Sequence, residues 1–318
     1  MGIVMETTGV LLMAYGGPDT LQDVGPYLLD VRGGRATSPE LVEEISQRYA
    51  AIGGGSPLLH ITEEQAAALE RVLNQKTGSQ TRFKTYVGMR HWAPRIQSAI
   101  AKMQEDGIRQ AIALVMAPHY STMSTDVYFQ HLNKAIDELG AEIEFKYIRS
   151  WYDHPELTAA IVEKVREASK NIPGGKPYIL FTAHSLPEEI IREGDPYPAQ
   201  LKQHAGLVAA ALGLPDDRWE FCFQSAGRTG EPWLGPNIDQ AVSRLAQDGQ
   251  TELLVVPLGF VADHVEVLYD IDIEAKAAAN RYGANLYRSA SLNATPTFIE
   301  ALADILFAVY NRELSSSH

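Results

Sequence analysis

The sequence predicts an α/β protein with two similar lobes, each containing a parallel β-sheet covered by helices. Two observations carry this prediction: short apolar runs alternate with stretches of helical periodicity, and the order of parts repeats along the chain. The length of 318 residues agrees, because it allows two domains of about 150 residues each.

Four apolar runs predict strands. Each is short, has little polar alternation and ends at Pro, Gly, Tyr or His, which is typical of strands covered on both faces. They are Val10–Ala14, Ile112–Ala117, Tyr178–Ala183 and Leu253–Leu258.

The stretches between these runs predict helices, because their apolar residues recur at helical spacing. Strands that alternate with helices indicate right-handed βαβ units and a parallel sheet. The predicted helices include Pro39–Ala51, Glu63–Leu73, Ile96–Glu105, Leu157–Ala168, Pro198–Leu212 and Ile238–Gln247.

The segments that follow the strands repeat loosely. Ala14–Pro18 after the first strand matches Ala183–Pro187, and Ala117–Tyr120 matches Pro257–Phe260. We therefore expect a first lobe over residues 1–150 and a second over 151–318, with the last helix free to pack back on the first lobe. Ligands of such sheets bind beyond the carboxyl ends of the strands, so the four post-strand segments are expected to line one cleft between facing lobes.

Composition excludes several classes of protein. A net charge of −13 argues against a nucleic-acid partner, which would require a basic face. The single cysteine, Cys222, cannot form an internal disulfide or a four-cysteine iron–sulfur cluster. Residues Met1–Thr8 show no secretory signal and no apolar run is long enough for a transmembrane segment, so we expect a cytoplasmic protein.

His184 and a line of acids are the candidates for metal chemistry. His184 follows a strand directly, where an imidazole can ligate a divalent metal or accept a proton. Glu266, Asp270 and Glu274 recur every four positions, which on a helix places three carboxylates along one face. This line is interpreted either as a conduit for hydrated divalent cations or as a solvated acidic face.

Eight blocks in the same order resemble the signatures of ferrochelatases, from about Gly9 to Leu306. The strongest pair is Ala183–Pro187 together with Gly259–Asp270. The others are Met13–Pro18, Arg48–Tyr49 leading to Gly53–Leu58, Gly88–His91, Ala117–Ser121, Ser150–Tyr152 and Glu231–Pro236.

The resemblance implies both a fold and an activity. The fold is chelatase-like, with two Rossmann-like lobes that each contain a parallel four-stranded sheet flanked by helices. The activity is insertion of ferrous iron, as substrate, into a porphyrin in haem biosynthesis. The chain length and the short segment after Tyr120 resemble the compact, cluster-free bacterial enzymes that convert coproporphyrin III to coprohaem. A monomer and a haem acceptor enzyme as partner are also expected.

The resemblance also implies roles for individual residues. His184 and Glu266 correspond to the catalytic, metal-handling pair on one face of the porphyrin, and Tyr15 to the ligand of the product iron on the other. Asp270 and Glu274 correspond to an outer metal relay that can carry Mg²⁺. Residues that match positions holding the macrocycle carboxylates are Arg32, Arg48, Tyr49, Ser56 and Tyr128.

Three positions leave alternatives open. His91 either contacts the porphyrin or orients a loop, and Trp233 either contacts the porphyrin or belongs to the core. Gly33 stands where relatives often carry a second arginine beside Arg32, so the pairing of arginines with propionates is not fixed.

Other functions remain open from the sequence. A ferrochelatase acting on protoporphyrin IX and a cobalt or nickel chelatase of another tetrapyrrole would use the same architecture. A haem-binding or haem-delivery protein would need Tyr15 but would have no use for Glu266 and the acids that follow it.

Overall fold

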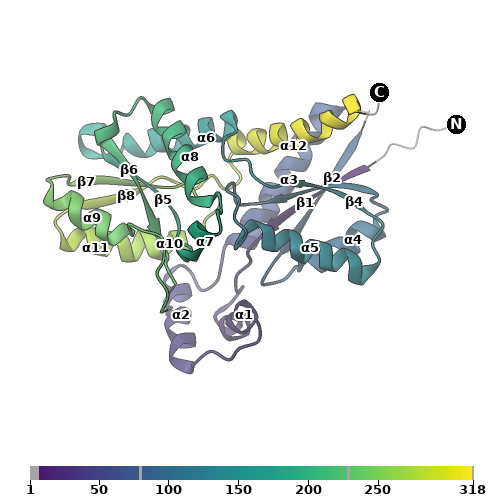
Figure 1. Ribbon diagram of the computed structural model, residues 1–318, viewed down its shortest axis with the longest axis horizontal. Coiled ribbons are helices and arrows are strands. Elements are labelled where there is room, and N and C mark those ends of the chain that lie inside the picture. The colour runs from purple at the N-terminus through teal and green to yellow at the C-terminus, as the bar shows by residue number, and fades with distance from the viewer. Residues whose placement is uncertain (1–6, 79–80, 228–229, 317–318) are drawn as a thin grey trace. The chain divides into compact units, whose positions relative to one another are not determined.

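The computed structural model describes residues 7–78, 81–227 and 230–316 (Figure 1). Residues 1–6, part of the segment for which the sequence predicts no secretory signal, lie outside the described residues. The chain forms two compact units. The first contains the described parts of Met1–Ala117, Ser124–Trp151 and Asn293–His318, and the second contains Pro118–Met123 and Tyr152–Leu292. The division into domains at residue 150 stays a prediction.

The first unit contains a four-stranded parallel sheet in the order β2-β1-β3-β4. Leu11 in β1 lies opposite Tyr86 in β2 and Ala113 in β3, so β1 lies between these two strands. Because β3 also pairs with β4, β1 and β3 are the two central strands. The strands are β1 (Thr7–Ala14), β2 (Arg82–Met89), β3 (Gln110–Val115) and β4 (Glu144–Ile148).

The second unit repeats this arrangement with the order β6-β5-β7-β8. Leu180 in β5 lies opposite Glu220 in β6 and Val255 in β7. The strands are β5 (Tyr178–His184), β6 (Trp219–Gln224), β7 (Glu252–Pro257) and β8 (Asn285–Arg288). The predicted fold class, two similar lobes with parallel four-stranded sheets, is therefore confirmed.

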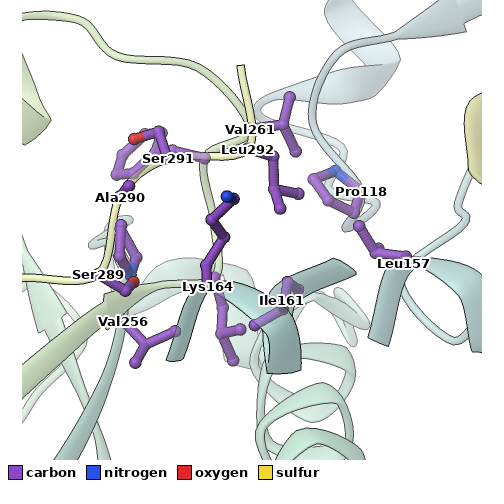
Figure 2. A pocket seen from close by; sticks show the side chains of 13 residues that line it. Pro118, Leu157, Ile161, Lys164, Val256, Val261, Ser289, Ala290, Ser291 and Leu292 are labelled. Carbon is purple, nitrogen blue, oxygen red and sulfur yellow. The ribbon is translucent and has the colours of Figure 1, made fainter. Parts of the chain in front are cut away.

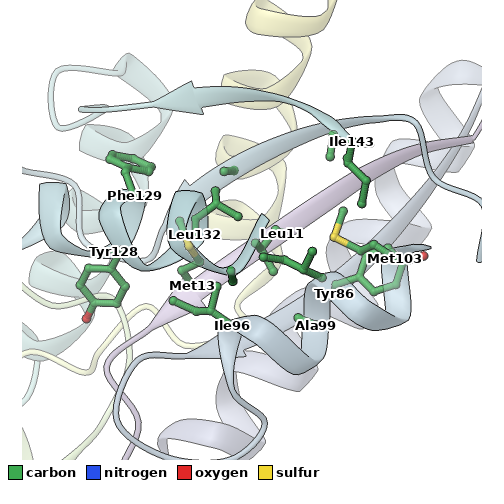
Figure 3. Packing of buried hydrophobic residues seen from close by; sticks show 14 of the residues in the cluster. Leu11, Met13, Tyr86, Ile96, Ala99, Met103, Tyr128, Phe129, Leu132 and Ile143 are labelled. Carbon is green, nitrogen blue, oxygen red and sulfur yellow. The ribbon is translucent and has the colours of Figure 1, made fainter. Parts of the chain in front are cut away.

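Helices cover the first sheet on both faces. Leu11 and Met13 in β1 pack in one apolar cluster with α4 and α5, as Figure 3 shows, while Val10 and Leu12 are equally buried on the other face of the strand. Helices α3 and α12 contact each other, and α3 also contacts β1 and β2. The helices of this unit are α1 (Val24–Val31), α2 (Pro39–Ala51), α3 (Leu58–Thr77), α4 (Ile96–Glu105), α5 (Thr125–Leu139) and α12 (Pro296–Ser316).

The helices of the second unit pair in the same way: α6 packs on α8, and α9 packs on α11 (Figure 1). Leu180, Leu253 and Val255 form an apolar cluster with α9 and the helical segments after Val265. These helices are α6 (Pro155–Ser169), α7 (Glu189–Arg192), α8 (Tyr197–Leu212), α9 (Ile238–Gln247), α10 (Val265–Leu268) and α11 (Lys276–Arg281).

Among the described residues, no helix combines the length and the apolar character needed to cross a membrane.

Candidate functional site

His184 is the last residue of β5, at the carboxyl end of the second sheet. Its Nδ1 makes a short contact with the carbonyl oxygen of Ser185, which can only accept, so Nδ1 carries the proton. The Nε2 atom lies 3.6 Å from Oε1 of Glu266. The lone pair of Nε2 is therefore available for a metal ion or a proton, beside a carboxylate.

Glu266 lies between two histidines. It is in α10, directly after the loop that follows β7, and its second oxygen lies 3.5 Å from Nε2 of His264. The Nδ1 atom of His264 donates to the carbonyl of Ala262 at 3.0 Å. Gln224, at the end of β6, donates from its amide to the backbone oxygen of Glu266 at 2.7 Å. The ends of β5, β6 and β7 thus surround Glu266, with the two histidines at its carboxylate and Gln224 at its backbone oxygen.

The electrostatics of this cluster favour a charged carboxylate. Burial alone raises the pKa of Glu266, but the positive charge that His184 carries when it is protonated and the contact with His264 outweigh it and lower the pKa to about 2. Burial also lowers the pKa of His264, and the contact with Glu266 reverses this, so that the pKa of His264 is raised. Glu266 is anionic at neutral pH and retains 32% side-chain exposure.

The acidic line departs from the predicted regular helix. After the single turn of α10, residues Asp270–Ala275 form a π-helix, in which the amide of Glu274 donates to the carbonyl of Tyr269 at 3.0 Å. A π-helical turn holds more residues than an α-helical turn, so spacing by four no longer describes one straight stripe. Burial nevertheless decreases along the line, since Glu266 and Asp270 are half-buried and Glu274 is exposed.

Two side chains anchor the π-helix from its flanks. Asp270 accepts a short hydrogen bond from the hydroxyl of Ser225. Asp272 accepts two bonds from the guanidinium of Arg288, at 2.8 and 2.9 Å, and this guanidinium also contacts Asp263 at 3.3 Å. Such bidentate pairs fix orientation as well as charge, so the backbone that carries Asp270 and Glu274 is held in place.

Within the described residues, no group of three or more His, Cys, Asp or Glu side chains is arranged to hold a metal ion. His184 and Glu266 are brought together, while Asp270 and Glu274 continue outward from them. An ion at His184 would thus find an incomplete ligand set and would take further ligands from water or from another molecule.

Trp233 and Gly259 complete this end of the sheet. The ring of Trp233 lies 6.2 Å from that of His184, and Trp233 is half-buried. A Cβ on Gly259 would lie 2.7 Å from the Cβ of Ala183, so only glycine allows the loop after β7 to pass this close to His184.

Tyr15 occupies the equivalent place after β1 in the first unit. It is 39% exposed and directly precedes Gly16 and Gly17. Gly16 has φ +90°, and a Cβ there would lie 2.9 Å from the backbone nitrogen of Trp92, so this turn requires glycine. The ring of Tyr15 lies 4.6 Å from that of His91.

His91 is held by an aspartate. Its Nδ1 donates to Asp30 at 2.9 Å, and the same carboxylate accepts two bonds from Arg95 at 3.0 and 2.9 Å. Burial outweighs this contact and lowers the pKa of His91 to about 4. His91 is thus a neutral imidazole at neutral pH, with its Nδ1 engaged and its ring against Tyr15.

Arg90 is a functional candidate that the sequence prediction missed, although it lies in the block Gly88–His91. Its guanidinium lies 5.8 Å from the ring centre of Tyr15 and 5.5 Å from that of Tyr128. Its Nε is buried without a hydrogen-bond partner. A cation stacked on two tyrosines beside the end of β1 is a candidate for contact with an anionic ligand. His264 was missed in the same way.

The remaining predicted contacts lie in the first unit, in different settings. A Cβ on Gly17 would lie 2.6 Å from Oγ of Ser56 and 3.7 Å from the hydroxyl of Tyr49, so these two side chains meet at the loop after Tyr15. Tyr49 is only 2% exposed, whereas Arg32 is exposed at the end of α1. Arg48 pairs with Glu44 at 3.4 Å.

Tyr128 belongs mainly to the core. It is 5% exposed and packs in the cluster with Leu11 and Met13, and Figure 3 shows its hydroxyl at the edge of that cluster, directed away from the apolar side chains. Only this hydroxyl could meet a ligand.

Two cavities can be set aside. A cavity of about 20 Å³ beside Lys164 and Leu292 has room for a single water (Figure 2). A wider groove of about 600 Å³ between α3 and α4 contains none of the predicted site residues.

Comparison with known proteins gives consistent relatives. A family model described as "Ferrochelatase" matches residues 7–309. The chain is 44% identical over 302 residues to a protein of Geobacillus sp. named "Coproporphyrin III ferrochelatase", covering 94% of this chain and 96% of the relative. It is 42% identical over 301 residues to a Deinococcus radiodurans protein named "Ferrochelatase", covering 94% of each.

Solved structures agree on the fold. The chain superposes on SirB from Bacillus subtilis with Fe³⁺ at a TM-score of 0.55 and 13% identity, covering 94% of each chain. It also superposes on the sirohydrochlorin chelatase SirB in complex with cobalt, at a TM-score of 0.53 and 11% identity, covering 94% of this chain and 93% of that one.

Proposed function

This chain belongs to the ferrochelatase family, and we propose that it inserts ferrous iron into coproporphyrin III, giving coprohaem. Iron insertion into a porphyrin in haem synthesis, a metal-inserting lyase activity, follows from the family. The choice of coproporphyrin III is supported by the names of relatives at 41–44% identity over 94% or more of this chain.

The observation that carries the chemistry is the contact between Nε2 of His184 and the carboxylate of Glu266. An imidazole and a carboxylate suit Fe²⁺ as borderline ligands. Because the described residues offer this pair rather than a closed set of three or four ligands, an ion bound there can be transferred to the porphyrin nitrogens.

Insertion also releases two protons from the pyrrole nitrogens. A carboxylate whose pKa is about 2 is a poor proton acceptor at neutral pH, so we assign proton acceptance to Nε2 of His184, which takes the first proton once the ion has left it and passes that proton to water before it takes the second. Glu266 holds the incoming ion and then stabilises the imidazolium that forms. The contact with His264 stabilises the negative charge of Glu266.

The polar residues of the first unit are proposed to bind the macrocycle. Arg32 and Arg48 supply charge-assisted bonds to propionates, and Tyr49, Ser56 and the hydroxyl of Tyr128 add neutral ones. This binding energy would hold the porphyrin bent towards the geometry that accepts the ion. We propose Tyr15 as the ligand of the product iron. His91 and Trp233 are proposed porphyrin contacts.

Several finer points are also proposals. Asp270 and Glu274 form an outer relay, and their carboxylates suit Mg²⁺, which keeps several of its waters and needs few protein ligands. We further propose a cytoplasmic monomer without an iron–sulfur cluster that passes its product to a haem acceptor enzyme. The arrangement of both residue sets along one cleft stays a prediction.

The test is anaerobic turnover with Fe²⁺, comparing coproporphyrin III, protoporphyrin IX and sirohydrochlorin. We expect insertion into coproporphyrin III with the highest kcat/KM. A preference for protoporphyrin IX would overturn the substrate assignment, and metallation of sirohydrochlorin alone would overturn the proposed activity. A protein that binds haem but metallates no porphyrin would be a haem carrier.

A further inference from the structure

The backbone that carries His184 is held from outside its strand by Tyr197, the first residue of α8. The hydroxyl of Tyr197 donates to the carbonyl oxygen of His184 at 3.0 Å. On the other side of the same peptide unit, the amide of Ser185 donates to the carbonyl of Gln224 at 2.8 Å. Both polar groups of this peptide unit are therefore satisfied, and its plane cannot rotate freely.

The orientation of that plane decides the state of the imidazole. The Nδ1 of His184 donates to the carbonyl of Ser185, the next group along the chain. The Ser185 carbonyl belongs to the next peptide unit, so a change in the torsion angles on either side of the fixed unit would move this carbonyl relative to the imidazole, and Nδ1 would lose its acceptor. The tautomer with a free Nε2 facing Glu266 depends on this arrangement.

Tyr197 is itself rigid. It is 7% exposed, and its ring packs in an apolar cluster that includes Ala183, the residue before His184. Burial raises the pKa of its hydroxyl, with Glu266 and Asp195 adding to the effect, so the hydroxyl stays protonated and remains a donor. Its hydroxyl bonds to the backbone oxygen of His184, and not to the imidazole or to the carboxylate of Glu266.

Asp195 fixes Tyr197 and a separate segment together. One carboxylate oxygen accepts the amide of Tyr197 at 2.9 Å. The other accepts the hydroxyl of Ser121 at 3.0 Å and both the amide and the hydroxyl of Thr122, at 2.7 and 2.8 Å. This carboxylate is buried and satisfied by four neutral donors, which tie the segment Pro118–Met123 to the start of α8.

From this geometry we infer that Tyr197 is a positioning residue for His184, and that Asp195 fixes the position of Tyr197 by linking its backbone to residues 118–123. The inference rests on the proposed function, because it gives Tyr197 a part in the reaction through His184. It deepens that function by naming the contacts that select the reactive tautomer.

The main test is Tyr197→Phe in the full chain. Removing the hydroxyl frees the carbonyl of His184, so we expect kcat for iron insertion to fall about tenfold while KM for coproporphyrin III changes less than about twofold. Nitrogen-15 NMR of the unliganded protein should show His184 as a mixture of tautomers instead of the single Nδ1–H form. The matched control is Tyr178→Phe, which removes a hydroxyl 3.5 Å from Glu220 at the opposite end of β5 and should change neither quantity.

A second variant keeps the inference testable if Tyr197→Phe does not fold. Asp195→Asn places an amide donor among the donors of Ser121 and Thr122, so we expect faster hydrogen exchange at the amide of Thr122 and a fall in kcat of about threefold. Wild-type kcat with accelerated exchange at Thr122 would overturn the role of Asp195.

The proposed function and the inference about Tyr197 can be disproved independently. If the wild-type protein metallates no porphyrin, the proposed function fails, whereas the NMR comparison still tests the effect of Tyr197 on His184. A wild-type tautomer state and a kcat within twofold of wild type in Tyr197→Phe would overturn the inference alone.

Discussion

Tyr15 and His184 occupy equivalent positions in two sheets of the same topology, yet they have different surroundings. Each ends or directly follows the first strand of its unit, β1 or β5, and that strand lies at the centre of its sheet. Around Tyr15 are the cation of Arg90 and the neutral imidazole of His91. Around His184 is the anionic carboxylate of Glu266.

The difference shows that the fold provides positions and the side chains provide the chemistry. A parallel sheet places loops at the carboxyl ends of its strands whatever those loops contain. At this position the second unit has nitrogen and oxygen atoms, as the proposed binding of a cation requires. The first unit has aromatic rings and guanidinium groups, as the proposed binding of an anionic macrocycle requires.

The largest effect should follow from breaking the proposed metal-handling pair of the second unit. His184→Ala or Glu266→Gln should lower kcat for iron insertion by at least about a hundredfold, about 2.7 kcal/mol, because the first removes a ligand and the proton acceptor, and the second removes a ligand and the charge that stabilises the imidazolium. Binding of coproporphyrin, measured by fluorescence quenching, should persist.

His60→Ala is the control for these variants, because that histidine is highly exposed on α3 and its removal should leave kcat unchanged. Retention of more than a tenth of wild-type kcat in both His184→Ala and Glu266→Gln would contradict the assignment.

Acid should destabilise the first unit through His91. Its pKa in the folded protein, about 4, lies below the ordinary value of 6.5, so the unfolded state binds more protons between these values. The stability contributed by neutral His91 is complete above about pH 6.5 and is lost as the pH falls towards 4. Between pH 7 and 5 the loss should be about 2 kcal/mol.

His91→Gln cannot titrate and should reduce this loss. Hydrogen exchange of the β1 amides at pH 7 and pH 5, corrected for intrinsic exchange rates, measures this loss of stability. The β5 amides of the second unit serve as the internal control. An equal loss of protection in β1 with and without His91 would show that the imidazole is not the titrating group.

Substrate choice should depend on the first unit. Coproporphyrin III has four propionates and protoporphyrin IX has two, so we expect at least about a tenfold preference in kcat/KM for coproporphyrin, about 1.4 kcal/mol. Arg48→Ala should reduce this preference. Arg109→Ala, an exposed arginine that precedes β3 and pairs with Glu142, should leave it unchanged. Equal kcat/KM values for the two porphyrins in the wild-type protein would show that the number of propionates does not determine substrate choice.

The smallest effect on rate is expected at Tyr15. Tyr15→Phe should insert iron with kcat within about threefold of wild type, because this side chain is assigned to the product and not to proton transfer. The bound product should lose the ferric high-spin signature of a phenolate ligand. Tyr282→Phe, at a similarly exposed tyrosine of the second unit, is the spectroscopic control. Identical product spectra in wild type and Tyr15→Phe would exclude Tyr15 as the ligand.

The sequence predicted the central strands and missed the edges. The four apolar runs correspond to β1, β3, β5 and β7, which are the two inner strands of each sheet. An inner strand is covered on both faces and flanked on both sides, so its composition is almost uniformly apolar. The edge strands β4 (Glu-Phe-Lys-Tyr-Ile) and β8 (Asn-Leu-Tyr-Arg) carry charged residues and resemble loops.

Residue spacing alone could not reveal the π-helix. The recurrence of Glu266, Asp270 and Glu274 predicts a regular helix, but the backbone forms a π-helix from Asp270 onward. There Ser225 holds the carboxylate of Asp270, and Arg288 holds that of Asp272. These partners are distant in the chain, so the departure from helical geometry has no local signal.

The sequence by itself determined the α/β class, the central strands, and His184 and Tyr15 at strand ends, because burial and strand termini leave a local pattern in composition. Tertiary structure alone decided which neighbours those residues have. The contact of Glu266 with His184, the stacking of Arg90 on Tyr15 and Tyr128, and the bond from Tyr197 to His184 all join separate segments. Such contacts arise from the packing of helices on sheets, which no single stretch of sequence specifies.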